Sequence, residues 1–287
     1  GRDAPGDWPS RGRPPEPAPP GLLRVVVVGD SVVYGSSLDV APIPGYCIQR
    51  SLTPLGWTPD RVAVISAGVP GYSTLQMAWL LRELLASLAP DAVVLWPAAW
   101  NDQAPAVIAP DSTMLKGRRE HPAREWARDH SLLFAALVPE DHSLPLEEIL
   151  DGWKRGEPPA GYRVDNSEVA GWVGGQLDDC ARAHVPAVVL ASAHPPQTAA
   201  EHPRTRSDAE TVILAAKVEG VPFVDAQAIL DASGLDPARA FVDYVHPSPE
   251  MNALLGEALA KELAPILETR AAEHAARGEP APSSTGL

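Results

Sequence analysis

The chain has 287 residues, of which 45% are hydrophobic, and this is enough to build one large α/β domain. No apolar run reaches the roughly 18 residues that a membrane-spanning helix needs, so we expect no integral membrane segment. The formal net charge of −14 disfavours binding of nucleic acid or of an anionic membrane through overall charge.

The first twenty residues contain seven prolines, and such a segment cannot form a core. We expect residues 1–20 to be an extended, disordered tether. The sequence begins with Gly rather than Met, so a leader or anchor upstream of it is one interpretation. An extracytoplasmic or secreted location after loss of such a leader, and a cytoplasmic location, both stay open. The sequence does not indicate an oligomeric state.

Short apolar runs rich in β-branched residues alternate with helical patterns. The runs predict strands that are buried on both faces, as in a parallel sheet, and they span residues 22–28, 61–66, 91–97, 186–192 and 221–226. Helices are predicted at 73–88, 167–184, 207–220 and 249–277. Ser73 is the expected N-cap of the first helix, and Pro265 is expected to interrupt the last. The alternation predicts a three-layer α/β/α sandwich with a mainly parallel, about five-stranded sheet.

Residues 21–270 are expected to form a single domain. The segment 103–166 breaks the alternation and is rich in proline and charge, so we interpret it as an insertion that forms a lid or a binding region. Residues 271–287 are expected to be a frayed helix end followed by a disordered tail.

The first predicted strand ends abruptly on the triplet Gly29-Asp30-Ser31. Ligands of open α/β sheets bind at the carboxyl ends of the strands, so Ser31 would be exposed where a substrate binds. Gly-Asp-Ser is also ordinary turn chemistry, and alone it does not identify a nucleophile. A serine needs a base, an orienting acid and oxyanion donors before it can perform acyl chemistry.

Candidates for these partners follow the other predicted strands or precede the last helix. Gly68, in SAGVPGYST, either directs its backbone N–H into the cleft or simply makes a turn. Asn101, in WPAAWND, is either an oxyanion donor or a helix N-cap. Asp243 and His246, in FVDYVHPS, have a spacing that lets a carboxylate orient one ring nitrogen while the other acts as a general base. The alternative for this pair is a solvated loop histidine beside an unrelated aspartate.

The four motifs around Ser31, Gly68, Asn101 and His246, in this order along the chain, resemble those of the SGNH hydrolase superfamily, also called the GDSL esterase/lipase family. The resemblance covers nearly all of the ordered chain. The resemblance implies that Ser31 is the nucleophile and that its N–H is one oxyanion donor. It assigns the other two oxyanion donors to the N–H of Gly68 and the side chain of Asn101. It assigns the acid and the base of the triad to Asp243 and His246, and it implies an SGNH/flavodoxin-like fold.

Two residues depart from the family pattern. Val32 stands where the name motif has Leu, and Ala99 replaces the usual Gly of the third block. The methyl group of Ala99 is expected to narrow the pocket or to shift Asn101. Asp30, Trp100 and His194 are further candidates for lining the substrate cleft. The alternatives are a place in the core for Trp100 and a surface loop for His194.

The resemblance implies a serine esterase that cleaves carboxylic esters through an acyl-enzyme, with small acyl or acetyl esters, including esters on glycans, as substrates. An acyltransferase that uses the same acyl-enzyme stays open, as does a catalytically silent carbohydrate- or ligand-binding module. We expect no cofactor and no metal, because the sequence lacks a zinc-protease motif, a Walker loop and a dinucleotide fingerprint. Cys47 and Cys180 match neither a disulfide framework nor a zinc pattern and are expected to be buried thiols.

Overall fold

The structure is a computed structural model that describes residues 21–36, 38, 43–97, 99–104, 110–112, 162–201 and 204–278. The expected tether, most of the expected insertion and the last nine residues lie outside the described residues.

Five strands form one all-parallel sheet, as the sequence predicted. They are β1 (Leu23–Gly29), β2 (Val62–Gly68), β3 (Ala92–Leu95), β4 (Ala187–Ala191) and β5 (Phe223–Asp225). Their order in the sheet is β2-β1-β3-β4-β5. The chain therefore moves from β1 to one side and then crosses back to β3 on the other side. Open α/β sheets bind ligands at such a switch point, outside the carboxyl ends of the strands.

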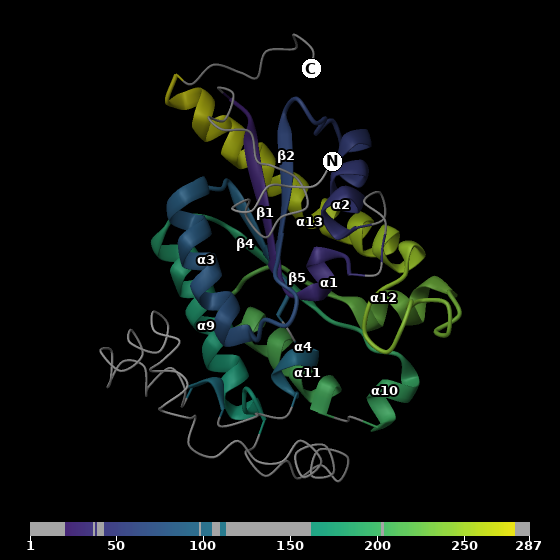
Figure 1. The fold of residues 1–287 in the computed structure, drawn as a ribbon. Coiled ribbons are helices and arrows are strands. Elements are labelled where there is room, and N and C mark those ends of the chain that lie inside the picture. Colours follow the sequence, from purple (N-terminus) through teal and green to yellow (C-terminus); the bar gives the residue numbers. More distant parts are fainter. Residues whose placement is uncertain are drawn as a thin grey trace, which may run out of the picture.

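Helices cover both faces of this sheet (Figure 1), which confirms the predicted three-layer sandwich. One face is covered by α2 (Pro44–Leu52), α12 (Ala226–Ser233) and α13 (Pro249–Ala276). The other face is covered by α3 (Thr74–Leu88), α9 (Asn166–Arg182) and α11 (Arg204–Val218). The short helices among the described residues are α1 (Ser31–Tyr34), the 3₁₀ helix η1 (Thr53–Leu55), α4 (Ala99–Asp102) and α10 (Pro196–Glu201).

Alternate residues of each strand contribute to two separate apolar cores. In β1, Val25 and Val27 belong to the core beneath α2 and α13, whereas Val26 and Val28 belong to the core beneath α3 and α9. Both sides of the strand are therefore buried, which explains why the apolar runs of the sequence are continuous. Cys47 and Cys180 are buried and unbonded within these layers, as predicted.

The predicted start of α3 is confirmed in detail. Ser73 is its N-cap, and its side chain accepts from the N–H of Gln76, while the Gln76 side chain accepts from the N–H of Ser73. This reciprocal pair is a capping box, which satisfies two backbone donors that the first helical turn leaves unpaired.

The predicted interruption of the last helix is wrong, because α13 is continuous across Pro265. Proline there removes the N–H that would bond to the carbonyl of Lys261. Pro265 is exposed, so water can satisfy that carbonyl, while the buried side chains of Leu263 and Leu267 hold the helix against the sheet. The helix also runs beyond residue 270, as far as Ala276.

The described ends of the 103–166 segment lie side by side. The N–H of Arg163 donates to the carbonyl of Ala104 at 3.0 Å, and the N–H of Val164 donates to the carbonyl of Asp102 at 3.0 Å. The chain therefore leaves and re-enters the domain at one place, beside α4. Among the described helices, none combines the length and the hydropathy that crossing a membrane would require.

Candidate active site

Ser31 is the first residue of α1 and follows β1 after a single residue. That residue, Asp30, caps the helix, because its Oδ1 accepts from the N–H of Val32 at 2.9 Å. Gly35 ends the helix after one turn in the left-handed region, with φ of 73°. This strand-to-helix turn holds Ser31 at the carboxyl edge of the sheet, where the strand order reverses.

Ser31 lies at one end of a chain of hydrogen-bonded side chains. Its Oγ is 2.9 Å from Nε2 of His246, and Nδ1 of His246 is 2.7 Å from Oδ2 of Asp243. A carboxylate facing Nδ1 favours the tautomer with the proton on Nδ1, which leaves Nε2 to accept the hydroxyl hydrogen of Ser31. The fold thus brings together three of the residues that the sequence singled out, although Ser31 is far from the other two in sequence.

Backbone hydrogen bonds close the loop that carries this pair. The N–H of Val242 donates to the carbonyl of His246 at 2.9 Å, and the N–H of Ser248 donates to the carbonyl of Ala240 at 2.8 Å. Ser248 is also the N-cap of α13, so the loop is anchored where that long helix begins. The predicted alternative of an unrelated loop aspartate and histidine does not fit this closed arrangement.

The loop wraps around the carboxylate of Asp243. Oδ1 of Asp243 accepts from the N–H groups of Val245 at 2.9 Å and His246 at 2.8 Å. Partial burial by itself would raise the pKa of Asp243, but these amides and the ring of His246 together outweigh it, so the pKa is lowered. The carboxylate therefore stays ionised while its other oxygen contacts the imidazole.

Gly68 lies directly beside the start of α1, because it is paired in register with Gly29 of β1. A Cβ atom at position 68 would lie 2.2 Å from the backbone N of Tyr34 and 2.6 Å from the carbonyl oxygen of Asp30. These two atoms are themselves joined by a hydrogen bond of 3.0 Å in the only turn of α1. Gly68 is therefore required by the close approach of α1 and β2, rather than by a turn.

Asn101 lies inside α4, so its predicted alternative as a helix N-cap is wrong. Its Nδ2 donates to Oδ2 of Asp30 at 2.7 Å and to the carbonyl oxygen of Tyr72 at 3.0 Å. Two acceptors fix the orientation of the amide, because a flipped side chain would turn its oxygen toward them. Both amide hydrogens are engaged, so an oxyanion would have to compete for one of them.

Asp30 is almost completely buried, with 4% of its surface exposed. Burial raises its pKa to about 6, against the opposing effects of the Val32 N–H, the nearby charge of His246 and the amide of Asn101. Asp30 thus links the nucleophile turn to α4.

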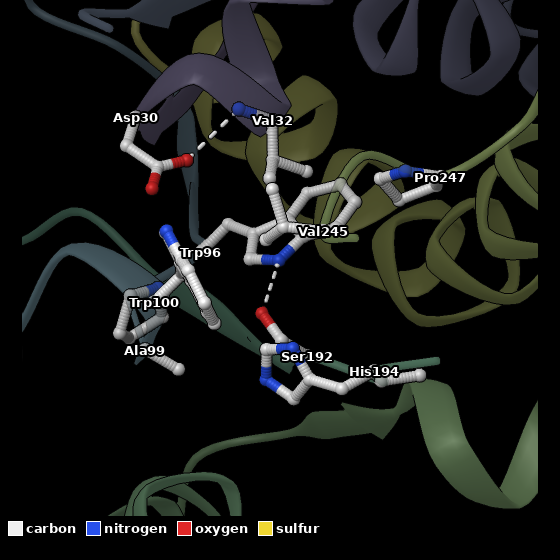
Figure 2. Close-up of a pocket in the computed structure, with 11 residues that line it drawn as sticks. Asp30, Val32, Trp96, Ala99, Trp100, Ser192, His194, Val245 and Pro247 are labelled. Carbon is white, nitrogen blue, oxygen red and sulfur yellow. Dashed lines mark hydrogen bonds between the residues drawn. The ribbon is translucent and has the colours of Figure 1, made fainter. Parts of the chain in front are cut away.

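A pocket, drawn in Figure 2, is lined by residues next in the chain to Ser31 and to His246. Its empty volume is about 280 Å³, including its open mouth. The lining comes from the neighbours of Ser31, the neighbours of His246 and the residues that follow β3 and β4: Asp30, Val32, Trp96, Pro97, Ala99, Trp100, Ser192, Ala193, His194, Val245 and Pro247. The structure therefore brings Asp30, Trp100 and His194 to one pocket, which Ala99 also lines.

Two tryptophans contribute differently to this pocket. Trp96 is buried, and its Nε1 donates to Oγ of Ser192 at 2.8 Å. Trp100 is half-buried, and its ring centroid lies 5.0 Å from that of Tyr244, with 53° between the rings. Sequence patterns did not indicate Ser192 or Tyr244 as site residues. Ser192 directly follows β4 and would have been found by searching every strand end for polar residues.

Asp102 anchors α4 to the start of α3. It is buried, and it accepts from the N–H of Thr74 at 2.7 Å and from the Thr74 hydroxyl at 2.5 Å. Burial, together with the nearby charges of Asp208 and Asp30, raises the pKa of Asp102 to about 8, although the Thr74 donors oppose the rise. Because Asp102 follows Asn101 directly, this anchor also positions the Asn101 amide.

We expect the free energy of unfolding to fall less steeply with rising pH in Asp102→Asn than in the wild type. Folding raises the pKa of Asp102 from 3.8 to about 8. Between these two pH values the carboxyl group is ionised in the unfolded chain but still protonated in the folded chain. The stability of the fold therefore falls as the pH rises through this range. Between about pH 6 and about pH 8, this group alone lowers the unfolding free energy by about 2 kcal/mol. Asn cannot ionise and retains an oxygen for the Thr74 N–H.

Urea unfolding at both pH values measures this difference, with the exposed Asp178→Asn as the matched control. The variant should lose about 2 kcal/mol less stability than the wild type over this interval, and the control should follow the wild type. Parallel pH curves for Asp102→Asn and the wild type would contradict the assignment.

Within the described residues, no group of three or more His, Cys, Asp or Glu side chains is arranged to hold a metal ion. The arrangement around Ser31 instead combines a hydroxyl, an imidazole and a carboxylate in series. These are the groups that nucleophilic acyl chemistry needs.

Comparisons with known proteins identify the family of this chain. The family model described as the GDSL-like Lipase/Acylhydrolase family matches residues 27–254. A search of curated proteins found no match.

Similar solved structures share the fold at low sequence identity. The lipase/acylhydrolase from Enterococcus faecalis has a TM-score of 0.55 and 16% identity, covering 85% of this chain and 96% of that one. Axe2, an acetylxylan esterase from Geobacillus stearothermophilus, has a TM-score of 0.54 and 14% identity, with coverages of 84% and 94%. LAE5, from the metagenome of Lake Arreo in Spain, has a TM-score of 0.53 and 16% identity, with coverages of 85% and 96%.

The family match begins within β1, spans the other four strands and the loop before α13, and confirms the resemblance found in the sequence. The chain therefore belongs to the GDSL-like lipase/acylhydrolase family of carboxylic ester hydrolases.

Proposed function

We propose that the protein hydrolyses small carboxylic esters through an acyl-enzyme formed on Ser31. The observation that carries this proposal is the continuous series of contacts from Ser31 Oγ to His246 and on to Asp243, at 2.9 and 2.7 Å. His246 takes the hydroxyl proton as Ser31 attacks the ester carbonyl, and Asp243 stabilises the imidazolium that forms. His246 then returns the proton to the departing alcohol, and water releases the acyl group by the same steps in reverse order.

The tetrahedral oxyanion is held, in this proposal, by the backbone N–H groups of Ser31 and Gly68 and by the amide of Asn101. Donors that are already oriented before the reaction stabilise the charge that develops in the transition state. Asn101 must first give up one of its two acceptors. The Tyr72 carbonyl is the more readily displaced, because its contact of 3.0 Å is the longer one and involves no charge.

A small acyl or alcohol group fits the pocket better than a long chain. The pocket is bounded by Trp96, Ala99 and Trp100. The similar Axe2 structure is that of an acetylxylan esterase, which supports acetyl esters, including those on glycans, as substrates of this chain. The proposal assigns no cofactor to this reaction, because the triad supplies every proton transfer.

Hydrolysis of p-nitrophenyl acetate, butyrate and octanoate tests the proposal. We expect kcat/KM to be highest for the acetate and to fall at least about 10-fold toward the octanoate, because each excluded methylene loses its burial. The same assays with an alcohol acceptor measure transfer, and a transesterified product in place of the free acid would indicate an acyltransferase. No turnover of any of these esters, nor of acetylated xylan, would leave a silent binding module as the better account.

A further inference from the structure

We infer that His194 recognises a hydroxyl group that the ester substrate carries close to its scissile bond. The inference rests on the proposed function, since it concerns the pocket beside the proposed nucleophile. It extends that function by naming the chemical group that distinguishes a good substrate from a poor one.

His194 is a buried polar side chain without a partner. Only 5% of its surface is exposed, and among the residues that the structure describes, neither Nδ1 nor Nε2 finds a hydrogen-bond partner. Buried polar groups are nearly always paired, because leaving one unpaired costs the hydration that it loses. Two orphaned nitrogens on one ring therefore indicate that a bound molecule completes the site.

The ring points into the pocket rather than into the core. Figure 2 shows it directed from the loop after β4 toward the side of the pocket formed by Ser192, Ala99 and Trp100. The nearest polar neighbour along the chain, Ser192, accepts from Trp96 Nε1 at 2.8 Å, so its own hydroxyl hydrogen must be directed elsewhere. Except for Asp30, the other lining residues are apolar or aromatic. His194 and Ser192 are thus polar groups placed on an otherwise apolar wall.

The pocket is formed in part by residues that flank the proposed nucleophile and base, although Ser31 and His246 themselves do not line it. Its lining includes both chain neighbours of Ser31, which are Asp30 and Val32, and both chain neighbours of His246. A group held in this pocket therefore belongs to a part of the ester only a few bonds from the carbonyl that Ser31 attacks.

The state of the ring selects the ligand chemistry. Burial lowers the pKa of His194 to about 4, so the ring is neutral at neutral pH and offers one N–H donor and one acceptor nitrogen. The two ring nitrogens point in diverging directions, so one hydroxyl pairs with one of them. A hydroxyl suits either nitrogen, because it can accept from the N–H or donate to the bare nitrogen, whereas a carboxylate can only accept and an ammonium can only donate. A carboxylate would also approach Asp30, whose ionised form repels it. An alkyl group would leave both nitrogens unpaired.

The hydroxyl can belong to the alcohol part or to the acyl part of the ester, and two matched pairs of substrates distinguish these cases. Propyl acetate and 2-hydroxyethyl acetate differ by a methyl group in place of a hydroxyl on the alcohol side. Ethyl propanoate and ethyl glycolate differ in the same way on the acyl side. We expect the wild type to prefer the hydroxylated member of one pair by about 10- to 100-fold in kcat/KM, as one or two neutral hydrogen bonds provide.

The variant His194→Phe keeps a planar ring of similar size and removes both nitrogens. We expect it to reduce the preference for the hydroxylated ester to within about 2-fold, measured as the ratio of kcat/KM within each pair. His194→Gln, which keeps a donor and an acceptor, should restore part of the preference. A preference that survives in His194→Phe, or that the wild type lacks for both pairs, overturns the inference.

A binding measurement separates this inference from the proposed chemistry. In Ser31→Ala, which can bind the ester but lacks the nucleophile, the ¹⁵N NMR signals of the His194 ring should shift on addition of the preferred hydroxylated ester. They should not shift with its alkyl counterpart. Equal shifts with both esters, or none with either, count against the role of His194 even where hydrolysis is observed. If the shift is selective but the wild type hydrolyses no ester, the role of His194 in binding is supported and the proposed acyl-enzyme mechanism is contradicted.

Discussion

Replacing Ser31 by alanine is expected to lower kcat about 10⁶-fold on every ester that the wild type hydrolyses. His246→Ala alone should cause a loss of similar size, because the nucleophile and its base act as a unit through the 2.9 Å contact between Oγ and Nε2. For the same reason the double variant should be scarcely slower than either single variant. Any residual rate above that of water would come from binding and from the oxyanion donors.

Steady-state hydrolysis of p-nitrophenyl acetate measures these losses, with Ser87→Ala as the control. Ser87 is exposed on α3, and its hydroxyl donates to the carbonyl of Glu83 one turn earlier. The control should retain wild-type kcat. If Ser31→Ala kept wild-type activity, the acyl-enzyme on this residue would have to be abandoned. If the losses of Ser31→Ala and His246→Ala multiplied in the double variant, the two residues would not be acting as a unit.

Asp243→Asn is expected to lower kcat about 10⁴-fold, although it changes only one atom of the side chain. Oδ1 of Asp243 accepts from the backbone N–H groups of Val245 and His246, so an asparagine would keep its oxygen there. Its NH₂ group would then face Nδ1 of His246, where Asp243 now places an oxygen at 2.7 Å. A donor at this position forces the ring proton onto Nε2, and Nε2 can then no longer accept the proton of Ser31.

The kcat of Asp243→Asn at neutral pH measures this effect, and circular dichroism shows whether the fold is kept. Asp178→Asn, on the exposed side of α9, makes the same chemical change far from the loop and should leave kcat unchanged. A loss below about 10-fold in Asp243→Asn would show that the carboxylate does little more than fill space.

Much of the candidate site could be named from the sequence, because its short motifs resemble those of a known family and two of these motifs are local. The Gly29-Asp30-Ser31 turn follows directly from the end of a buried strand. Asp243 and His246 are three residues apart, so one closed loop is enough to join them. The parallel sheet was likewise predictable, because strands buried on both faces leave continuous apolar runs.

The parts that sequence patterns missed depend on contacts between distant segments. The amide of Asn101 meets Asp30 and Tyr72 only after β1, α3 and α4 have packed together. The ring of Trp100 meets Tyr244 across a still longer separation in the chain. No local propensity encodes such pairs.

Pro265 shows the same limit in a different way. A proline predicts a broken helix by its own chemistry, but its exposed position and the buried leucines on either side keep α13 continuous.

The pairing of Gly29 with Gly68 constrains how this protein can be engineered. A Cβ atom at position 29 would lie 2.2 Å from Cγ2 of Val33, and one at position 68 would meet the backbone of α1 at the same distance. On the β1–β2 side of the site, the chain is therefore packed too closely for either glycine to be replaced by a residue with a Cβ atom. A mutant library aimed at new ester selectivity should hold both glycines constant and vary the opposite wall, at Ser192 and His194, where exchange of a side chain leaves the backbone in place.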